Sequence, residues 1–172
     1  VVVGYKKKNI LTALNKYKKI DFILNKKFNT TDMVHSLMIG LKKYKDNILF
    51  SYSDIIYENN IFNKLKETNN KHIVIPYLKD WNKIWKIRKK SIYKDAETFE
   101  FDNYKFLKEI GKKITDKKKV QGQFMGLIYI PKNLTTDILK IYQDNFKNKK
   151  IQTTQFLQFL VEKQFKIKCM EY

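Results

Sequence analysis

The sequence predicts an α/β domain in which helices cover both faces of a mixed, mostly parallel sheet. The first half of the chain alternates β-branched or aromatic runs with apolar residues at helical spacing, a pattern typical of strand–helix–strand units. The second half adds a predicted hairpin. The chain has 172 residues, of which 43% are hydrophobic, so residues 1–172 can form one domain around a substantial core.

Four strands separated by three helices are predicted in the first half. The first helix follows from Ile10, Leu14 and Tyr17, which recur at helical spacing. The second helix follows Thr31 or Asp32, either of which can cap it. In order, the elements are strand Val1–Gly4, helix Lys7–Lys19, strand Ile20–Leu24, helix Met33–Leu41, strand Asn47–Ser53, helix Ile61–Glu67 and strand His72–Leu78.

The second half has a different pattern. Residues Glu97–Phe101 and Phe106–Ile110 flank the turn-forming pair Asp102 and Asn103, which predicts a hairpin. The remaining predicted elements are helix Asp80–Lys90, strand Gln121–Pro131, helices Leu134–Phe146 and Thr153–Phe165, and strand Lys166–Tyr172.

Composition limits the function classes. The formal net charge of +19 suggests anionic partners. Because Arg88 is the only arginine, however, we interpret the charge as a solvated lysine-rich surface, with a field for phosphorylated substrates and nucleic-acid binding as the alternatives. We expect no nucleic-acid partner, no membrane partner and a cytoplasmic location, since the sequence shows no apolar run of membrane-spanning length and no signal peptide. The oligomeric state stays open.

Asp54 is the leading candidate for the reacting centre. It follows the bulky run Ile48–Tyr52, which reads as a buried central strand. A carboxylate at the end of such a strand stands at the edge where open α/β sheets bind ligands, so we interpret Asp54 as a metal ligand. The alternative is an Asp that caps the following turn.

Five stretches together resemble a known superfamily. They are SYSDIIY from Ser51, DWNKIWKIR from Asp80, DAET from Asp95, EIGKK from Glu109 and QGQFMGLIYI from Gln121. In this order and spacing they resemble nucleotidyltransferases of the sugar-phosphate and phosphocholine type, most of all the phosphocholine cytidylyltransferase-like branch. Some members of that branch activate choline phosphate or 2-aminoethylphosphonate.

The resemblance implies a three-layer nucleotidyltransferase-like fold and a reaction. The implied reaction is Mg²⁺-dependent transfer of a nucleotide, CMP from CTP, to a small phosphorylated or phosphonate acceptor, with pyrophosphate released. The family's N-terminal glycine-rich nucleotide loop and C-terminal metal-binding Asp find no match here, so we expect a domain that is incomplete at both ends. The alternatives are a sugar-1-phosphate nucleotidyltransferase and a non-catalytic remnant or binding module.

The resemblance also implies functional lysines. Lys112 and Lys113 follow Gly111 at the end of a predicted strand, where the family has a lysine, and Lys113 fits that position better. Such a lysine can pair with a substrate phosphate as a point charge. The alternative is a pair of solvated surface lysines.

A second group suits the head group of the acceptor. Asp95 and Glu97 share one face of an extended segment, and Trp81 and Trp85 share one face of a helix. Carboxylates and aromatic faces together suit an ammonium group. The alternative is that the tryptophans pack in the core and the acids neutralise nearby lysines. Arg88 can hold a phosphate or pair with Asp95.

The stretch from Gln121 to Gly126 completes the predicted substrate site. The amides of two glutamines are expected to form hydrogen bonds in it, namely Gln121 and Gln123. The backbone is expected to approach the substrate closely at Gly122 and Gly126. The rival interpretation is a bulged strand.

Overall fold

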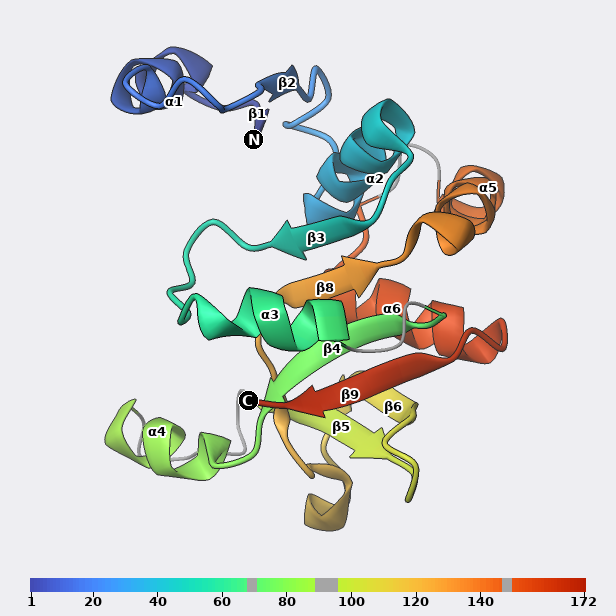
Figure 1. Cartoon of the computed structure of the whole chain (residues 1–172). Helices are drawn as coiled ribbons and strands as arrows, with labels where there is room; N and C mark the ends of the chain where they lie inside the picture. Colours follow the sequence, from blue (N-terminus) through green and yellow to red (C-terminus); the bar gives the residue numbers. More distant parts are fainter. Residues whose placement is uncertain (68–70, 89–95, 147–149) are drawn as a thin grey trace. The chain divides into compact units, whose positions relative to one another are not determined.

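The computed structural model describes residues 1–67, 71–88, 96–146 and 150–172, which fold as two compact units (Figure 1). The first unit comprises Val1–Asp46 and Thr135–Thr153, and the second comprises Asn47–Leu134 and Thr154–Tyr172.

The second unit is built on a mixed sheet of five strands. The strands are β3 Ile48–Ser51, β4 Ile73–Leu78, β7 Gln123–Phe124, β8 Leu127–Ile130 and β9 Ile167–Glu171. Strand β8 pairs antiparallel with both β3 and β4, β7 also pairs antiparallel with β4, and β9 pairs parallel with β4. Strands β3, β4 and β9 therefore run one way, and β7 and β8 run the other way.

The α/β class and the mixed sheet are confirmed, but the expectation of a mostly parallel sheet is wrong, because three of the four pairings among the described strands of this sheet are antiparallel. The position of β3 also differs from the prediction. It lies at one end of the order β3-β8-β4-β7 and is not central. The reason is that β8, which comes from the second half of the chain, lies between β3 and β4. The predicted strand Gln121–Pro131 is also divided into β7 and β8, because Gly126 has a φ of 77°.

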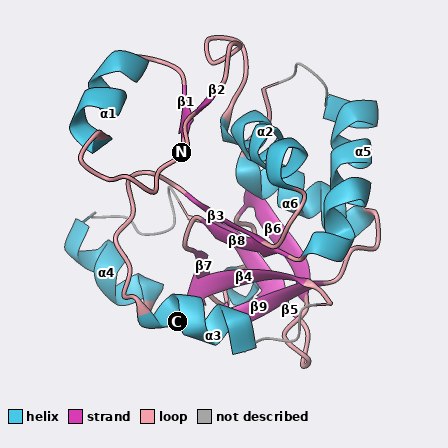
Figure 2. Ribbon diagram, turned by 45° about the horizontal axis from the view of Figure 1, so that its top comes forward, coloured by secondary structure: helices cyan, strands magenta, loops and turns pink. Residues whose placement is uncertain are grey.

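Helices cover both faces of this sheet. Figures 1 and 2 show α3 (Asn60–Glu67) and α6 (Thr153–Glu162) on opposite faces. On one face, Ile61 and Leu65 of α3 pack in a core cluster with Val74, Leu127 and Tyr129. These five side chains are almost completely buried, so the contact stabilises both the helix and the sheet beneath it.

The predicted hairpin is confirmed as β5 (Glu97–Phe101) and β6 (Leu107–Lys113), which pair antiparallel. Its turn is held by the Asp102 carboxylate, which accepts hydrogen bonds from the backbone N–H groups of Tyr104 at 2.9 Å and Phe106 at 2.8 Å. The short helix α4 (Trp81–Arg88) precedes the hairpin, and the 3-10 turn η1 (Lys117–Lys119) follows it.

The first unit contains a two-stranded parallel sheet, β1 (Val2–Val3) and β2 (Ile23–Leu24), together with three helices. These helices are α1 (Lys7–Leu14), α2 (Met33–Tyr44) and α5 (Thr135–Phe146); the turn η2 (Lys132–Leu134) precedes α5. Of the two predicted caps for helix α2, Asp32 is the one observed, and its carboxylate accepts a hydrogen bond from the Met33 N–H at 2.8 Å. Helix α1 ends five residues before the predicted Lys19, and no residue of α1 is buried, so little packing extends it.

Within the described part of the chain, no helix has both the length and the apolar character needed to cross a membrane.

Candidate functional site

A depression of about 600 Å³ opens on the second unit where β3 and β4 end. We call it the Asp54 depression. Because β3 and β4 run in the same direction, their carboxyl ends meet at one edge of the sheet, which is where open α/β folds bind ligands. Its walls come from the segment after β3, the end of β4, strand β7 and the turn between β7 and β8. The lining residues are Tyr52, Asp54, Ile55, Ile56, Tyr57, Leu78, Gln123, Phe124, Met125 and Gly126.

Asp54 lies on this wall with an exposed side chain. Neither a hydrogen bond nor an ion pair joins its carboxylate to another described residue, so no turn-capping bond supports the alternative interpretation. A hard cation such as Mg²⁺ is commonly held by one or two carboxylates plus phosphate and water oxygens. The Asp54 carboxylate can supply one such carboxylate ligand. Among the described residues, no three His, Cys, Asp or Glu side chains are grouped closely enough to hold a metal by themselves.

The depression owes its shape to the contact between Gly126 and Tyr52. The Tyr52 backbone N–H donates a hydrogen bond to the Gly126 carbonyl at 3.0 Å. A Cβ at position 126 would lie 2.8 Å from the Tyr52 ring, so only glycine allows this approach. The Tyr52 ring also makes an edge contact with Phe124, with ring centroids 6.1 Å apart. The close approach predicted at Gly126 is therefore made to a protein side chain.

The two predicted glutamines have different environments. Gln123 lines the Asp54 depression, and its Oε1 is buried without a hydrogen-bond partner among the described residues. Gln121 faces the hairpin instead, where its Oε1 accepts a hydrogen bond from the Phe101 N–H at 2.7 Å. Gly122 lies against the Tyr77 ring, since a Cβ there would come within 2.3 Å of it.

The predicted lysines lie on β6 and do not line the Asp54 depression. Lys112 forms an ion pair with Glu109 at 2.9 Å. The hydrogen bond between these two groups raises the pKa of Lys112 and lowers that of Glu109. Lys113 is exposed and stands opposite Glu97 in the β5–β6 pairing.

The predicted ammonium site is only partly described. Trp81 is 5% exposed and packs with Ala96 and Val120 in a small hydrophobic cluster. Trp85 and Arg88 lie on α4, but their side chains, like the whole of Asp95, lie outside the described residues. Sequence reasoning did not single out Tyr52, Tyr57 or Met125 as site residues, although each is a neighbour of a predicted residue within the same two motifs.

Cys169 is not a candidate nucleophile. Burial raises the pKa of its thiol to about 12, so the reactive thiolate is not formed at neutral pH.

Known proteins resemble this chain in sequence and in structure over almost its whole length. No protein-family model matches it. The chain is 29% identical to the CTP:phosphoglutamine cytidylyltransferase of Campylobacter jejuni, in a match that covers 99% of this chain and 72% of that protein. The inositol-1-phosphate CTP transferase from T. maritima covers 99% of the chain with a TM-score of 0.71 and 14% identity. A protein described as a glucose-1-phosphate thymidylyltransferase from Bacillus anthracis gives a TM-score of 0.70 at 12% identity.

The chain spans 64% and 66% of the lengths of these two solved structures. The structural matches establish the fold, and the curated relative extends the likeness to the sequence over almost every residue. The resemblance noted from the five stretches is thereby confirmed: over almost its whole length the chain is similar to a cytidylyltransferase in sequence and to nucleotidyltransferases in fold.

Proposed function

We propose that the protein transfers CMP from CTP to a small phosphorylated or phosphonate acceptor and releases pyrophosphate. The observation that carries this proposal is the Asp54 carboxylate, which has no ion pair or hydrogen bond with any described residue and lies on the wall of a depression at the carboxyl ends of β3 and β4. The choice of nucleotide is supported by the Campylobacter jejuni relative, whose name gives CTP as its substrate.

In this proposal Asp54 would hold Mg²⁺, which would offset the negative charge on the phosphates of CTP while an acceptor oxygen bonds to the α-phosphorus and the bond from that phosphorus to pyrophosphate breaks. The chain's own task is positioning. The amide of Gln123 and the backbone at Gly126 contact the bound substrate, and the rings of Tyr52 and Phe124 exclude water from one side of it.

Further roles rest on the resemblance. We propose that Lys113 or Lys112 pairs with a phosphate group. We also propose that Gln121 helps to line the substrate site. The carboxylates of Asp95 and Glu97 would bind the ammonium end of an acceptor. Helix α4 would contribute the remaining substrate contacts, through Trp81, Trp85 and Arg88.

Pyrophosphate release with Mg²⁺ tests the proposal. CTP, UTP and dTTP would be crossed with phosphocholine, 2-aminoethylphosphonate, phosphoglutamine and glucose-1-phosphate, on this chain and on any longer native chain that contains it. We expect release with CTP and one of the first three acceptors. Release with UTP or dTTP and glucose-1-phosphate would instead support a sugar-1-phosphate nucleotidyltransferase.

If the longer chain releases no pyrophosphate with any nucleotide–acceptor pair, the proposal is contradicted and a non-catalytic binding module is supported. Isothermal titration of the same proteins with CTP would then show whether nucleotide binding remains without transfer.

A further inference from the structure

A depression of about 460 Å³ lies in the second unit, between the β5–β6 hairpin and the turn that leads from α6 into β9. We call it the Phe106 depression. Phe106 lines it and also contacts the ring of His72, which directly precedes β4. The Asp54 depression contains Leu78, the last residue of β4, so the two depressions lie at opposite ends of that strand (Figure 1).

Both walls of the Phe106 depression are formed by turns with a fixed backbone. Lys105 in the hairpin and Gln164 after α6 have φ angles of 62° and 64°, and the Gln164 N–H donates a hydrogen bond to the Val161 carbonyl at 2.9 Å. Non-glycine residues in this left-handed region are uncommon and are concentrated at ligand sites. The hydrogen bonds of the two turns hold the walls in place without a ligand.

The lining of the depression is mostly apolar, as is typical of sites for small molecules. Leu107 is buried, and the other apolar lining residues are half-buried, so they present apolar surface to a ligand; these are Phe106, Val161 and Phe165. The ring of Tyr104, which is 76% exposed, stands beside them.

Two ammonium groups lie beside the Phe106 ring. The Nζ atoms of Lys166 and Lys168 are 5.5 and 4.9 Å from the centroid of that ring. Lys168 also donates a hydrogen bond to the Tyr104 carbonyl at 2.6 Å, which holds its ammonium group at this wall. Within the described ranges, neither lysine forms an ion pair with a carboxylate, so both charges are available to an anion.

His72 lies in the same positive field. Its ring meets the Phe106 ring edge to face, with ring centroids 5.2 Å apart. Burial lowers the pKa of His72, and the charges of Lys166, Lys168 and Lys71 lower it further. An anion bound beside Phe106 would oppose this effect, because a nearby negative charge favours the imidazolium form.

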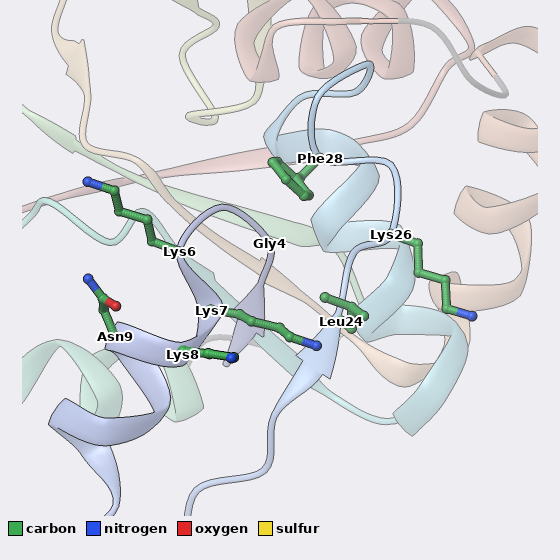
Figure 3. A pocket seen from close by; sticks show the side chains of 8 residues that line it. All are labelled: Gly4, Lys6, Lys7, Lys8, Asn9, Leu24, Lys26 and Phe28. Atoms are coloured by element: carbon green, nitrogen blue, oxygen red, sulfur yellow. The ribbon is translucent and has the colours of Figure 1, made fainter.

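Lysines of the first unit do not converge in this way. A depression beside β1 and α1 is lined by four lysines, two of which, Lys6 and Lys26, extend away from it (Figure 3). Its charges therefore do not gather around one ligand.

We propose that the Phe106 depression binds a small monocarboxylate that has an aromatic or branched apolar body. The apolar lining suits the body, and the ammonium groups of Lys166 and Lys168 suit the carboxylate. A single negative charge fits best because Asp102 also lines the depression, and its carboxylate repels a more highly charged anion. The inference concerns binding alone and does not depend on nucleotidyl transfer.

The experiment is a titration of the full chain at low ionic strength, followed by proton NMR of its two histidines, His35 and His72. The probe is 3-phenylpropionate, at concentrations up to about 20 mM. We expect saturable binding that raises the pKa of His72. His35, whose ring lies beside Tyr142, is the internal reference and should keep its pKa.

Three further compounds separate the parts of the ligand. They are 3-phenylpropanol, which has the same body without the charge, acetate, which has the charge without the body, and phenyl phosphate, which has a second negative charge. We expect each to bind at least about 5-fold more weakly than 3-phenylpropionate.

Single variants locate the binding site. Lys166→Gln removes an exposed lysine that lines the depression, and Lys168→Gln removes the other ammonium group. The matched control is Lys163→Gln, because Lys163 is an exposed lysine whose Nζ lies 5.4 Å from the Phe159 ring and which does not line the depression. We expect each of the first two variants to weaken binding about 3- to 10-fold and the control to change it less than about 2-fold.

Four outcomes would overturn the proposal. They are an unchanged pKa of His72 at the highest concentration of 3-phenylpropionate, equally tight binding of 3-phenylpropanol, tighter binding of phenyl phosphate, and equal weakening by Lys166→Gln and Lys163→Gln. Because neither nucleotide nor acceptor is present, a failure here is distinct from an absence of pyrophosphate release.

Discussion

Replacing Gly126 by alanine should destabilise the second unit and deform the Asp54 depression. Gly126 has a φ of 77°, and forcing alanine into that left-handed region costs about 1–2 kcal/mol. The new Cβ would also lie 2.8 Å from Tyr52 Cδ2 and 2.9 Å from its Cγ, an overlap that costs about 1–3 kcal/mol to relieve. The expected loss of unfolding free energy is therefore about 2–5 kcal/mol.

Urea unfolding followed by tryptophan fluorescence measures this loss of unfolding free energy in the unit that contains Gly126. Both tryptophans, Trp81 and Trp85, belong to the second unit, so their emission reports on the unit that contains Gly126. The control is Gly40→Ala in α2, where a Cβ meets nothing within 4 Å and where alanine favours the helix. We expect Gly40→Ala to leave the tryptophan transition unchanged or to stabilise the chain.

A double-mutant cycle separates the two causes. In a Tyr52→Ala background the ring clash is absent, so Gly126→Ala should cost only the backbone contribution of about 1–2 kcal/mol. If Gly126→Ala costs less than about 0.5 kcal/mol in the native background, the reasoning from φ and ring contact is wrong. An equal cost in both backgrounds would remove the ring contact from the explanation.

Two further predictions concern the first unit. Asn25→Ala should destabilise it by about 1–3 kcal/mol, measured by amide hydrogen exchange, because the buried Asn25 side-chain amide donates to Thr31 Oγ1 at 3.2 Å and Ser36 Oγ at 3.3 Å. Burial lowers the pKa of His35, whose Nδ1 lies 2.9 Å from the Tyr142 hydroxyl oxygen. The free energy of unfolding should therefore fall as the pH drops from about 6.5 through this lowered pKa. Urea titrations between about pH 5 and 8 should show this dependence, and His35→Gln should reduce it.

Local signals in the sequence predicted most of the secondary structure. The Asp32 cap and the Asp102 turn act on residues within four positions of themselves, so a short window of sequence contains the whole cause. The place of β8 between β3 and β4 depends on pairing between residues about 80 positions apart, which no local pattern contains. For the same reason the sequence placed β3 at the centre of the sheet.

The candidate site was predictable in part for the same physical reason. Asp54, Gln123 and Gly126 were singled out from motif chemistry and strand ends, and the structure brings these three together on one depression. Lys112 was singled out because it follows Gly111. Its ion pair with Glu109, three residues earlier, depends on the irregular register of the β5–β6 pairing, which the sequence pattern does not specify. The Tyr52 wall depends on the left-handed turn at Gly126, whose φ no spacing rule specifies.

The central claim is that Asp54 supports nucleotidyl transfer. Its most direct test is the rate of pyrophosphate release from CTP, with Mg²⁺ and the acceptor panel, for the native protein, Asp54→Asn and Asp144→Asn. Asp144 is an exposed acid on α5 and serves as the matched control. We predict that Asp54→Asn loses on the order of 100-fold or more in rate, while Asp144→Asn stays within about 2-fold. A native rate for Asp54→Asn would contradict the account.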